Sequence, residues 1–405
     1  MTNRIRATLI SVSLGVLSYV AVGAMLGRSD TSSEKTYRDL GVYSEVLNRI
    51  KQEYVTDPDL KKVTDGAIRG LLESLDSYST YLTPEQYKDY LAHPDPGPAD
   101  VGIFISKRMG YATIVAVLPG SPAEKAGVKP GDLIDEVEGV PTRQYSVVQL
   151  ERLMAGQPDS SVKLTLVREG RVEPESISIK RAILTYPPVF TKMLEDGTGY
   201  LRVATFNKGK AREIAARIKD LQSQGARKLV LDLRNCAGGD VQEAVDTASL
   251  FLNKGLVTYL AGQRFPRQDV EVHPTGPVCA LPLAVLINQS TAGPAELVAS
   301  ATLGNKRGEV VGERSFGVGV YQKPIPVGDG SALLLSVAKY YGADGKAINE
   351  NGVTPSVVQP ATREADNAEE EYQPEEPEQF GGKDDLQLRK AIEILGQAAA
   401  SAKAA

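Results

Sequence analysis

The sequence predicts a multidomain α/β (α+β) protein with a helical N-terminal segment, a domain of short strands and an α/β core of crossover units. Three observations predict this class. Apolar residues recur at three- and four-residue spacing before residue 92, β-branched runs bounded by turn residues fill 100–182, and apolar strands alternate with helices over 197–358. The 405 residues suffice for two to three domains.

Composition excludes several function classes. Hydrophobic residues make up 42% of the chain and charged residues 24%, as in ordinary globular proteins, and the net charge of −5 gives no basic excess for nucleic acid. The two histidines, His93 and His273, leave little for a histidine-based metal site, so we expect no metal and no cofactor. The two cysteines, Cys236 and Cys279, allow at most one disulfide, and the sequence leaves open whether they pair.

The N-terminus predicts export. Residues 7–26 carry no charge, whereas Arg4, Arg6 and Arg28 flank them. At a rise of about 1.5 Å per residue such a helix spans a bilayer, and basic flanks are typical of export signals. We expect 1–30 to be a signal peptide or a membrane anchor, with the rest periplasmic or otherwise extracytoplasmic and held at the inner membrane. The sequence leaves open whether the segment is cleaved.

Helices are predicted over 34–97, where apolar residues lie at helical spacing. One such set is Tyr43, Val46, Leu47, Ile50 and Tyr54. Thr83 is suited to cap a helix that begins at Pro84. A proline-rich run at 94–98 then indicates a linker.

Short strands dominate 100–182, with strands expected at 101–105, 112–117, 133–137, 162–168 and 175–181, and a helix at 145–155. The order Gly102-Ile103-Phe104-Ile105, followed by the turn-rich run from 118 to 132, resembles a bacterial PDZ domain. The resemblance implies binding of a peptide carboxyl terminus by strand addition at a sheet edge. It places Gly102, Ile103 and Phe104 in the carboxylate-binding loop, and Val147 and Leu150 along the groove. Simple core packing is an equally good interpretation of Val147 and Leu150.

An α/β core is predicted over 184–360, where strands at 199–203, 228–234 and 283–288 alternate with helices at 211–222, 241–252 and 294–303. The following tail carries eight acids and no Lys or Arg between Glu364 and Glu378, which indicates a disordered linker. These patterns divide the chain into 1–30, 34–97, 100–182, 184–360, an acidic linker at 361–383 and a C-terminal helix at 384–400.

Ordered motifs run through most of the chain. They are Leu75-Asp76-x-Tyr78-Ser79-x-Tyr81-Leu82, Asp232-Leu233-Arg234-Asn235-x-x-Gly238-Gly239, Gly312-Glu313-x-x-Phe316-Gly317-x-Gly319-x-x-Gln322, Lys339-Tyr340-Tyr341 and Asn351-Gly352-Val353-Thr354-Pro355. With the inserted PDZ domain, residues 38–358 resemble the carboxyl-terminal processing peptidases, also called tail-specific serine proteases. The resemblance implies a serine nucleophile, a lysine general base oriented by a glutamine, and two backbone N–H groups for the oxyanion.

The sequence departs from that family where the chemistry is done. The nucleophile position is Gly293, which has no side chain, and the base position is Val318, which cannot accept a proton. Pro294, the next residue after the nucleophile position, has no N–H for the oxyanion. The orienting glutamine, Gln322, and the oxyanion turn at Gly238 and Gly239 remain.

Other nucleophiles are available by sequence. Ser290 and Thr291 lie just upstream of the nucleophile position and Ser315 lies nearby, although Ser290 and Thr291 also suit turn and cap roles. Two hypotheses follow. The first is an inactive homologue that binds C-terminal tails of envelope proteins as a scaffold or regulator, with an active homologous protease or a second copy as a further partner. The alternative is an active serine endopeptidase that cleaves near protein C-termini with a relocated nucleophile.

Overall fold

The computed structural model describes residues 31–93, 97–108, 110–168, 170–171, 173–273, 279–361, 380–382 and 384–404. The expected signal peptide or anchor at 1–30 and most of the expected acidic linker at 361–383 lie outside these residues. No helix within the described ranges is long and apolar enough to cross a membrane. The chain divides into two compact units, Met1–Ile68 and Arg69–Ala405.

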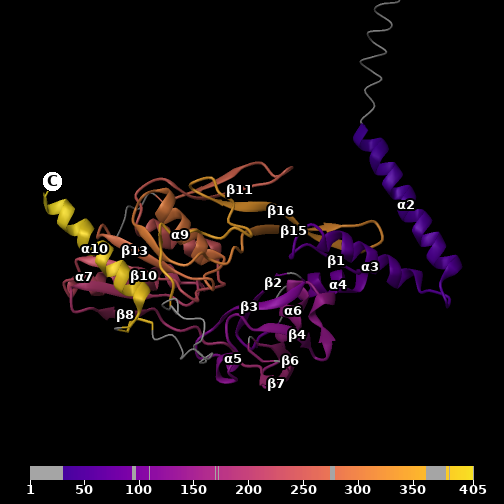
Figure 1. Ribbon diagram of the computed structural model, residues 1–405, viewed down its shortest axis with the longest axis horizontal. Coiled ribbons are helices and arrows are strands. Elements are labelled where there is room, and N and C mark those ends of the chain that lie inside the picture. The colour runs from indigo at the N-terminus through magenta and orange to yellow at the C-terminus, as the bar shows by residue number, and fades with distance from the viewer. Residues whose placement is uncertain are drawn as a thin grey trace, which may run out of the picture. The chain divides into compact units, whose positions relative to one another are not determined.

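The first unit holds helix α2 (Thr31–Glu53) and the first part of α3 (Leu60–Glu73), labelled in Figure 1. On α2, Arg49 forms ion pairs with Glu45 and Glu53, each four residues away along the helix. Such pairs add a few tenths of a kcal/mol each to a helix, roughly 0.2–0.5. The prediction of helices in this part of the chain is confirmed.

The second unit starts with a short strand and a capped helix. Thr83 caps α4 (Pro84–Ala92): its side chain accepts the Gln86 N–H, and the Gln86 side chain accepts the Thr83 N–H, with Pro84 at the first helical position as predicted. Strand β1 (Thr80–Leu82) was not predicted from the sequence. It is only three residues long and pairs with residues 332–334, so its neighbours give no local strand pattern.

The predicted PDZ region folds as one antiparallel sheet with two helices. Its elements are β2 (Ile103–Arg108), β3 (Tyr111–Val117), α5 (Pro122–Lys125), β4 (Leu133–Val137), β5 (Val140–Pro141), the 3₁₀ turn η1 (Thr142–Gln144), α6 (Val147–Met154), β6 (Ser161–Val167) and β7 (Glu175–Lys180). The strand order is β2-β3-β4-β6-β7, with β5 beside β4. Within this sheet β2 is therefore an edge strand. Ser121 and Ser146 cap α5 and α6.

A second sheet carries the α/β core. Its order is β17-β14-β13-β10-β9-β8, formed by β8 (Phe190–Met193), β9 (Thr198–Arg202), β10 (Lys228–Asp232), β13 (Leu283–Ile287), β14 (Glu309–Gly312) and β17 (Val357–Val358). All neighbours pair in parallel except β8 and β9. The predicted crossover helices are α7 (Lys210–Ser223), α8 (Val241–Ser249) and α9 (Pro294–Gly304).

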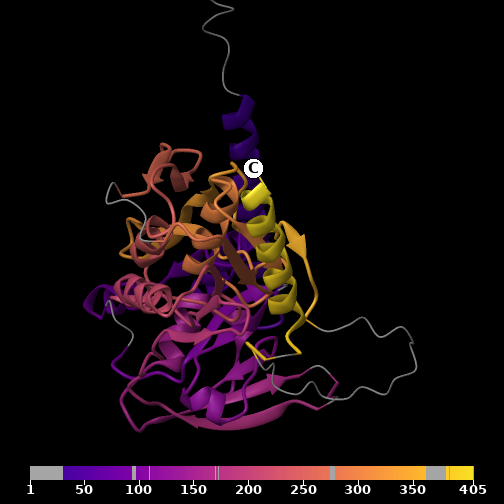
Figure 2. The ribbon, with the colours of Figure 1, turned by 90° about the vertical axis from the view of Figure 1, so that its left-hand side faces the viewer.

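The two faces of this sheet are covered by different helices. Alternate side chains such as Leu231 and Val285 pack with Ile214 of α7 and Val298 of α9. The intervening side chains pack against the predicted C-terminal helix, α10 (Leu386–Ala404), which lies on the other face (Figure 2). Because both faces are buried, the strands are almost continuously apolar, which is why the sequence revealed them.

The sequence did not predict the third sheet. It has the order β1-β16-β11-β12, with β15 also paired to β16, and consists of β11 (Leu256–Ala261), β12 (Gln268–Glu271), β15 (Val320–Pro326), β16 (Ala332–Gly342) and β1. Residues of β12 and β15 are largely exposed, so no buried face imposes an alternating pattern on them.

Candidate active-site cleft

Three loops meet at one edge of the core sheet. They follow the parallel strands β10, β13 and β14, and they span residues 233–239, 288–293 and 313–319. The carboxyl ends of parallel strands lie at the same edge, which is where α/β proteins build their sites. The sequence-predicted nucleophile and base positions and the oxyanion turn at Gly238 and Gly239 fall in these three loops, whereas Pro294, the other predicted oxyanion position, is the first residue of α9.

Glu296 joins the loop 288–293, which contains the predicted nucleophile position, to the loop 313–319, which contains the predicted base position. Its carboxylate accepts the Gly293 N–H at 2.8 Å, the Gly317 N–H at 2.7 Å and the Val318 N–H at 2.8 Å. The Ser315 hydroxyl donates to the same carboxylate at 2.5 Å. Glu296 is fully buried, and burial raises the pKa of its carboxyl to about 7, against these four hydrogen bonds, which lower it. One carboxylate therefore places the backbone of positions 293 and 318 side by side.

Hydrogen bonds also join the loop 233–239, which contains the Gly-Gly turn, to the loop 288–293. The Asn235 N–H donates to the Asn288 Oδ1 at 3.0 Å, and the Asn288 Nδ2 donates to the Asn235 Oδ1 at 2.7 Å. The Ala292 N–H donates to the Cys236 carbonyl at 3.0 Å. The backbone frame thus keeps the turn at 238 and 239 beside the start of α9.

Gly293 has the backbone conformation φ 62°, ψ −120°, directly before Pro294 opens α9. A Cβ at Gly293 would meet nothing within 4 Å, so the site has room for a side chain. The positive φ would nevertheless strain any L-residue by roughly 1–3 kcal/mol. Glycine adopts this φ without strain, and Pro294 begins the helix without an N–H to donate.

The base position lies in an apolar cluster shared with the PDZ region. Val318 packs with Ala237, Ala292 and Phe316 of the core and with Phe104, Val115 and Ala116 of the PDZ region. The Phe104 ring lies directly against the oxyanion turn, because a Cβ added to Gly238 would come within 2.1 Å of a ring carbon. The predicted base position is therefore surrounded by apolar side chains, and the Phe104 ring covers the turn at Gly238.

Gln322 has a different partner from the one expected. Its Nε2 donates to the carbonyl of Tyr78 at 2.8 Å, so the amide holds the motif segment 75–82. That segment connects the other two sheets: the Tyr78 hydroxyl is 2.9 Å from the Ser106 hydroxyl on β2, and the Ser79 hydroxyl accepts the Ser336 N–H on β16 at 3.1 Å. Burial raises the pKa of Tyr78 to about 12, so its hydroxyl stays protonated.

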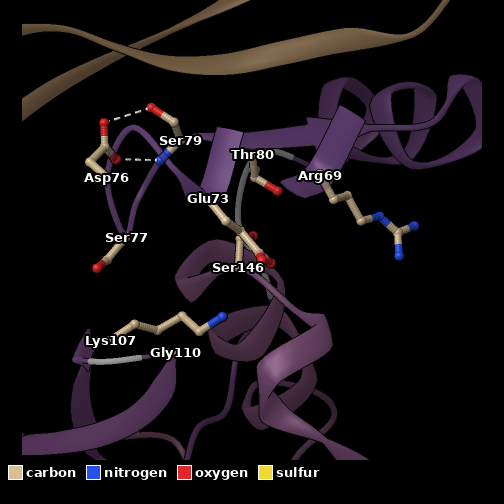
Figure 3. A pocket seen from close by; sticks show the side chains of 9 residues that line it. All are labelled: Arg69, Glu73, Asp76, Ser77, Ser79, Thr80, Lys107, Gly110 and Ser146. Atoms are coloured by element: carbon tan, nitrogen blue, oxygen red, sulfur yellow. Dashed lines mark hydrogen bonds between the residues drawn. The ribbon is translucent and has the colours of Figure 1, made fainter. Parts of the chain in front are cut away.

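A small cavity of about 80 Å³ lies where this segment faces the PDZ region. Figure 3 shows Arg69, Glu73 and Lys107 around it, and the two hydrogen bonds that Asp76 accepts from the N–H and hydroxyl of Ser79. The Lys107 ammonium donates to the backbone carbonyls of Arg143 and Tyr145, at 3.3 and 2.9 Å. Asp76 and Lys107 thus hold backbone groups of neighbouring loops.

Two of the three alternative nucleophiles, Thr291 and Ser315, use their hydroxyls in hydrogen bonds within the fold. Thr291 is fully buried, donates its hydroxyl to the Leu233 carbonyl at 2.8 Å and accepts the Asn288 N–H at 3.0 Å. The Ser290 N–H donates to the Asn288 Oδ1 at 3.1 Å, as in a turn. Ser315 is buried between Glu296 and the Val353 N–H. Within the described residues, no hydrogen bond joins these hydroxyls to a lysine or histidine.

Both cysteines are free and buried, so they do not pair. Burial raises the pKa of the Cys236 and Cys279 thiols, which disfavours the thiolate that a nucleophile needs.

The residues assigned to peptide binding lie together on the PDZ region. The Gly102 N–H donates to the Asp100 carboxylate at 2.8 Å, and burial raises the pKa of Asp100. Gly102 has φ +83°, and an added Cβ would come within 2.4 Å of Ser121, so only glycine fits. Ile103, Val147 and Leu150 are at most 7% exposed and belong to the PDZ core. The role of Ile103 in the carboxylate-binding loop and the role of Val147 and Leu150 along the groove stay predictions.

Sequence reasoning missed the central role of Glu296. The only available signal was an acid in the first turn of an otherwise apolar helix, a position where carboxylates commonly bind backbone N–H groups. Its partners at 315–318 come from another loop, so no local spacing could reveal them.

The chain thus joins a PDZ-like antiparallel sheet to an α/β core that carries three loops at one strand edge. Residues 197–359 match the model of Peptidase family S41, and residues 113–168 match that of the PDZ domain. The chain is 32% identical to "Carboxy-terminal processing protease CtpA" of Bacillus subtilis (strain 168), over 86% of this chain and 75% of that protein.

A second relative gives the same result. The "Carboxy-terminal-processing protease" of Bartonella bacilliformis (strain ATCC 35685 / KC583 / Herrer 020/F12,63) is 32% identical, over 85% of this chain and 80% of that protein. Among solved structures, "Photosystem II D1 C-terminal processing protease" superposes with a TM-score of 0.65 at 28% identity, covering 78% of this chain and 92% of that one. The chain belongs to the carboxyl-terminal processing peptidase family, with its PDZ domain, as its motifs predicted.

Proposed function

We propose that this protein is a non-catalytic member of its family that binds the C-terminal tails of other exported proteins. The observation that carries the proposal is the pair Gly293 and Val318, held by the Glu296 carboxylate with neither a nucleophile nor a base between them. Acyl transfer by a serine-type peptidase needs both groups. Gly293 offers no oxygen, and Val318 offers hydrocarbon to an apolar cluster.

The PDZ region supplies the binding activity in this proposal. Its edge strand β2 offers backbone groups to an added peptide strand, and the loop at Gly102 would receive the tail carboxylate. The Asp100 carboxylate now accepts the Gly102 N–H, so an incoming tail has to displace it. The core contact through Phe104 is next to this loop, which would link tail binding to the covered cleft.

Localisation and partners extend the proposal. The uncharged segment 7–26 with its basic flanks supports export, with the segment acting as a signal or as an inner-membrane anchor. The tails bound would then belong to envelope proteins. An active homologue or a second copy of this chain would be a further partner, through which the protein acts as scaffold or regulator.

Proteolysis by the full-length chain tests the proposal. We expect no fragments when it is incubated with an unfolded protein that ends in an apolar tail, together with measurable binding of that tail. Cleavage that disappears in a variant combining Ser290→Ala, Thr291→Ala and Ser315→Ala would establish the alternative, an endopeptidase with a relocated nucleophile. Cleavage that persists in that variant would reject both hypotheses.

Restoring the missing groups gives the matched gain-of-function experiment. A variant combining Gly293→Ser, Pro294→Ala and Val318→Lys regains nucleophile, N–H donor and base on the same backbone frame. We expect it to cleave the unfolded protein, and the same variant with Gly293→Ala in place of Gly293→Ser to be inactive.

A further inference from the structure

One edge of strand β16 is paired with other strands at its two ends but not in its middle. Strand β15 pairs with β16 along residues 332–339, so it occupies one edge of that strand. Strands β1 and β11 must therefore share the opposite edge, where β1 pairs with residues 332–334 and β11 with residues 339–342. Residues 335–338 lack a strand partner on this edge within the described part of the chain.

A groove of about 710 Å³ lies at residues 335–338. The turn between β11 and β12 lines one side of it, with Gly262 so close to the Val337 carbonyl that an added Cβ would come within 2.0 Å of the oxygen. Leu75 lines it from the motif segment, while Ile325 and Leu335 line it from β15 and β16. Leu75 is 64% exposed and Ile325 is 39% exposed, so the groove presents apolar surface to solvent.

Three cations line the same groove: Arg264, Lys323 and Lys339. None of them forms an ion pair with any carboxylate that the structure describes. The Lys323 ammonium lies 5.1 Å from the centre of the Phe265 ring, which keeps it at the groove wall.

Asp76, the one acid among the described residues that line the groove, already accepts hydrogen bonds. The Asp76 carboxylate accepts the N–H groups of Tyr78 and Ser79 and the hydroxyl of Ser79. It also accepts the Ser336 hydroxyl at 3.3 Å. The groove thus has a cationic excess above apolar walls, a combination that fits an acidic ligand with hydrocarbon side chains.

We propose that this groove binds an extended acidic peptide segment of a partner protein, anchored by an aliphatic side chain. The three cations match carboxylates of the segment, and Leu75, Ile325 and Leu335 offer a surface for the aliphatic group. A nucleic acid could meet the cations, but it has no aliphatic side chain for these walls. The groove shares no residue with the PDZ loop, so this second peptide site is independent of the proposed tail binding.

Fluorescence anisotropy with the full-length chain tests the site. The probe is a fluorescein-labelled peptide of alternating Glu and Leu with an amidated carboxyl end, which offers the PDZ loop no terminal carboxylate. We expect Lys323→Glu combined with Lys339→Glu to weaken binding at least about tenfold, and added salt to weaken binding to the unmodified chain. Lys254→Glu, an exposed lysine outside the groove, should leave the affinity unchanged.

A separate substitution tests the apolar wall of the groove. Ile325→Ser should weaken the Glu-Leu peptide while leaving the weaker binding of an all-Glu peptide unchanged. Arg264→Ala, in the exposed turn, repeats the charge test without reversing a charge within a strand. Affinity unchanged in both charge variants, with melting curves like those of the unmodified chain, would overturn the proposal. Tighter binding of a labelled oligodeoxythymidine than of the peptide would overturn it as well.

Discussion

Two polar clusters on the core sheet differ in the groups that they bind. Glu296 starts α9 on one face and binds backbone N–H groups, beside positions 293 and 318 that lack any reactive group. Arg234 contacts Gln387 of α10 on the other face and donates hydrogen bonds to two buried carboxylates, Asp232 and Asp385. The difference teaches that buried charged groups of this chain hold segments of the fold together, Glu296 through backbone N–H groups and Arg234 through carboxylates.

The second cluster is a buried ion network. Arg234 donates to Asp232 at 2.6 Å and to both Asp385 oxygens, at 2.9 and 2.6 Å. The Tyr200 hydroxyl donates to Asp232 at 2.6 Å, and the Phe380 ring lies 4.4 Å from the guanidinium carbon of Arg234. Burial alone would raise the pKa of Asp385, but the hydrogen bonds and charge of Arg234 lower it overall. A motif arginine therefore fastens the C-terminal helix.

Removing Arg234 should have the largest effect on stability. Arg234→Met leaves Asp232 and Asp385 buried without a cation, and breaking such a pair costs roughly 3–5 kcal/mol. We expect urea unfolding at a lower concentration and faster proteolytic removal of α10. Lys390→Met, which breaks only the exposed pair with Glu393 on α10, is the control and should change stability little. Equal effects of the two substitutions would show that the buried network of Arg234 stabilises the protein no more than an exposed ion pair does.

Glu296 should make stability depend on pH. Its folded-state pKa of about 7 lies above the ordinary value of 4.5. The folded state therefore holds the proton more tightly than the unfolded state does. The resulting contribution of Glu296 to the free energy of unfolding is complete below pH 4.5 and is lost as the pH rises through 7. The shift corresponds to about 3 kcal/mol. Urea unfolding between pH 5 and pH 8 should show that the free energy of unfolding of Glu296→Gln does not decline in this way. If it declined with pH as steeply as in the unmodified chain, Glu296 would be excluded as the source of the decline.

A side chain at Gly293 should cost less. Gly293→Ser has room for its Cβ but takes a strained φ, so we expect a loss of roughly 1–3 kcal/mol in the free energy of unfolding. Gly293→Ala should cost about the same, because the strain comes from the Cβ and not from the hydroxyl. Neither variant alone should cleave protein, since Val318 supplies no base. A neutral effect of both substitutions on thermal unfolding would contradict the strained geometry.

The smallest expected effect concerns tail binding. Asp100→Asn removes a negative charge that competes with a tail carboxylate for the Gly102 N–H. We expect the affinity for a peptide with a free carboxyl end to rise about fivefold, or roughly 1 kcal/mol. The same peptide with an amidated end should not gain, as isothermal titration can show. A gain for both peptides would assign the effect to something other than the carboxylate.

The elements that the sequence predicted are those with a local pattern. Buried strands such as 283–288 read as apolar runs, and the cap at Thr83 follows from residues three positions apart. Strand β15 is largely exposed, so no buried face imposes an alternating pattern on it. Strand β1 has three residues and pairs with a distant part of the chain, as with Thr80 and Leu334, so its neighbours in sequence give no strand pattern.

The sequence by itself determined the family and which reactive side chains are present, because Gly293 and Val318 have no functional group in any conformation. Only the tertiary structure decided which groups are brought together. Glu296 joins loops that lie about twenty residues apart, and Arg234 forms hydrogen bonds with Asp385, which lies 151 residues further along the chain. Likewise Phe104 covers Gly238 only once two domains pack. Hydrogen bonds and packing depend on distance in space, which composition and spacing along the chain do not specify.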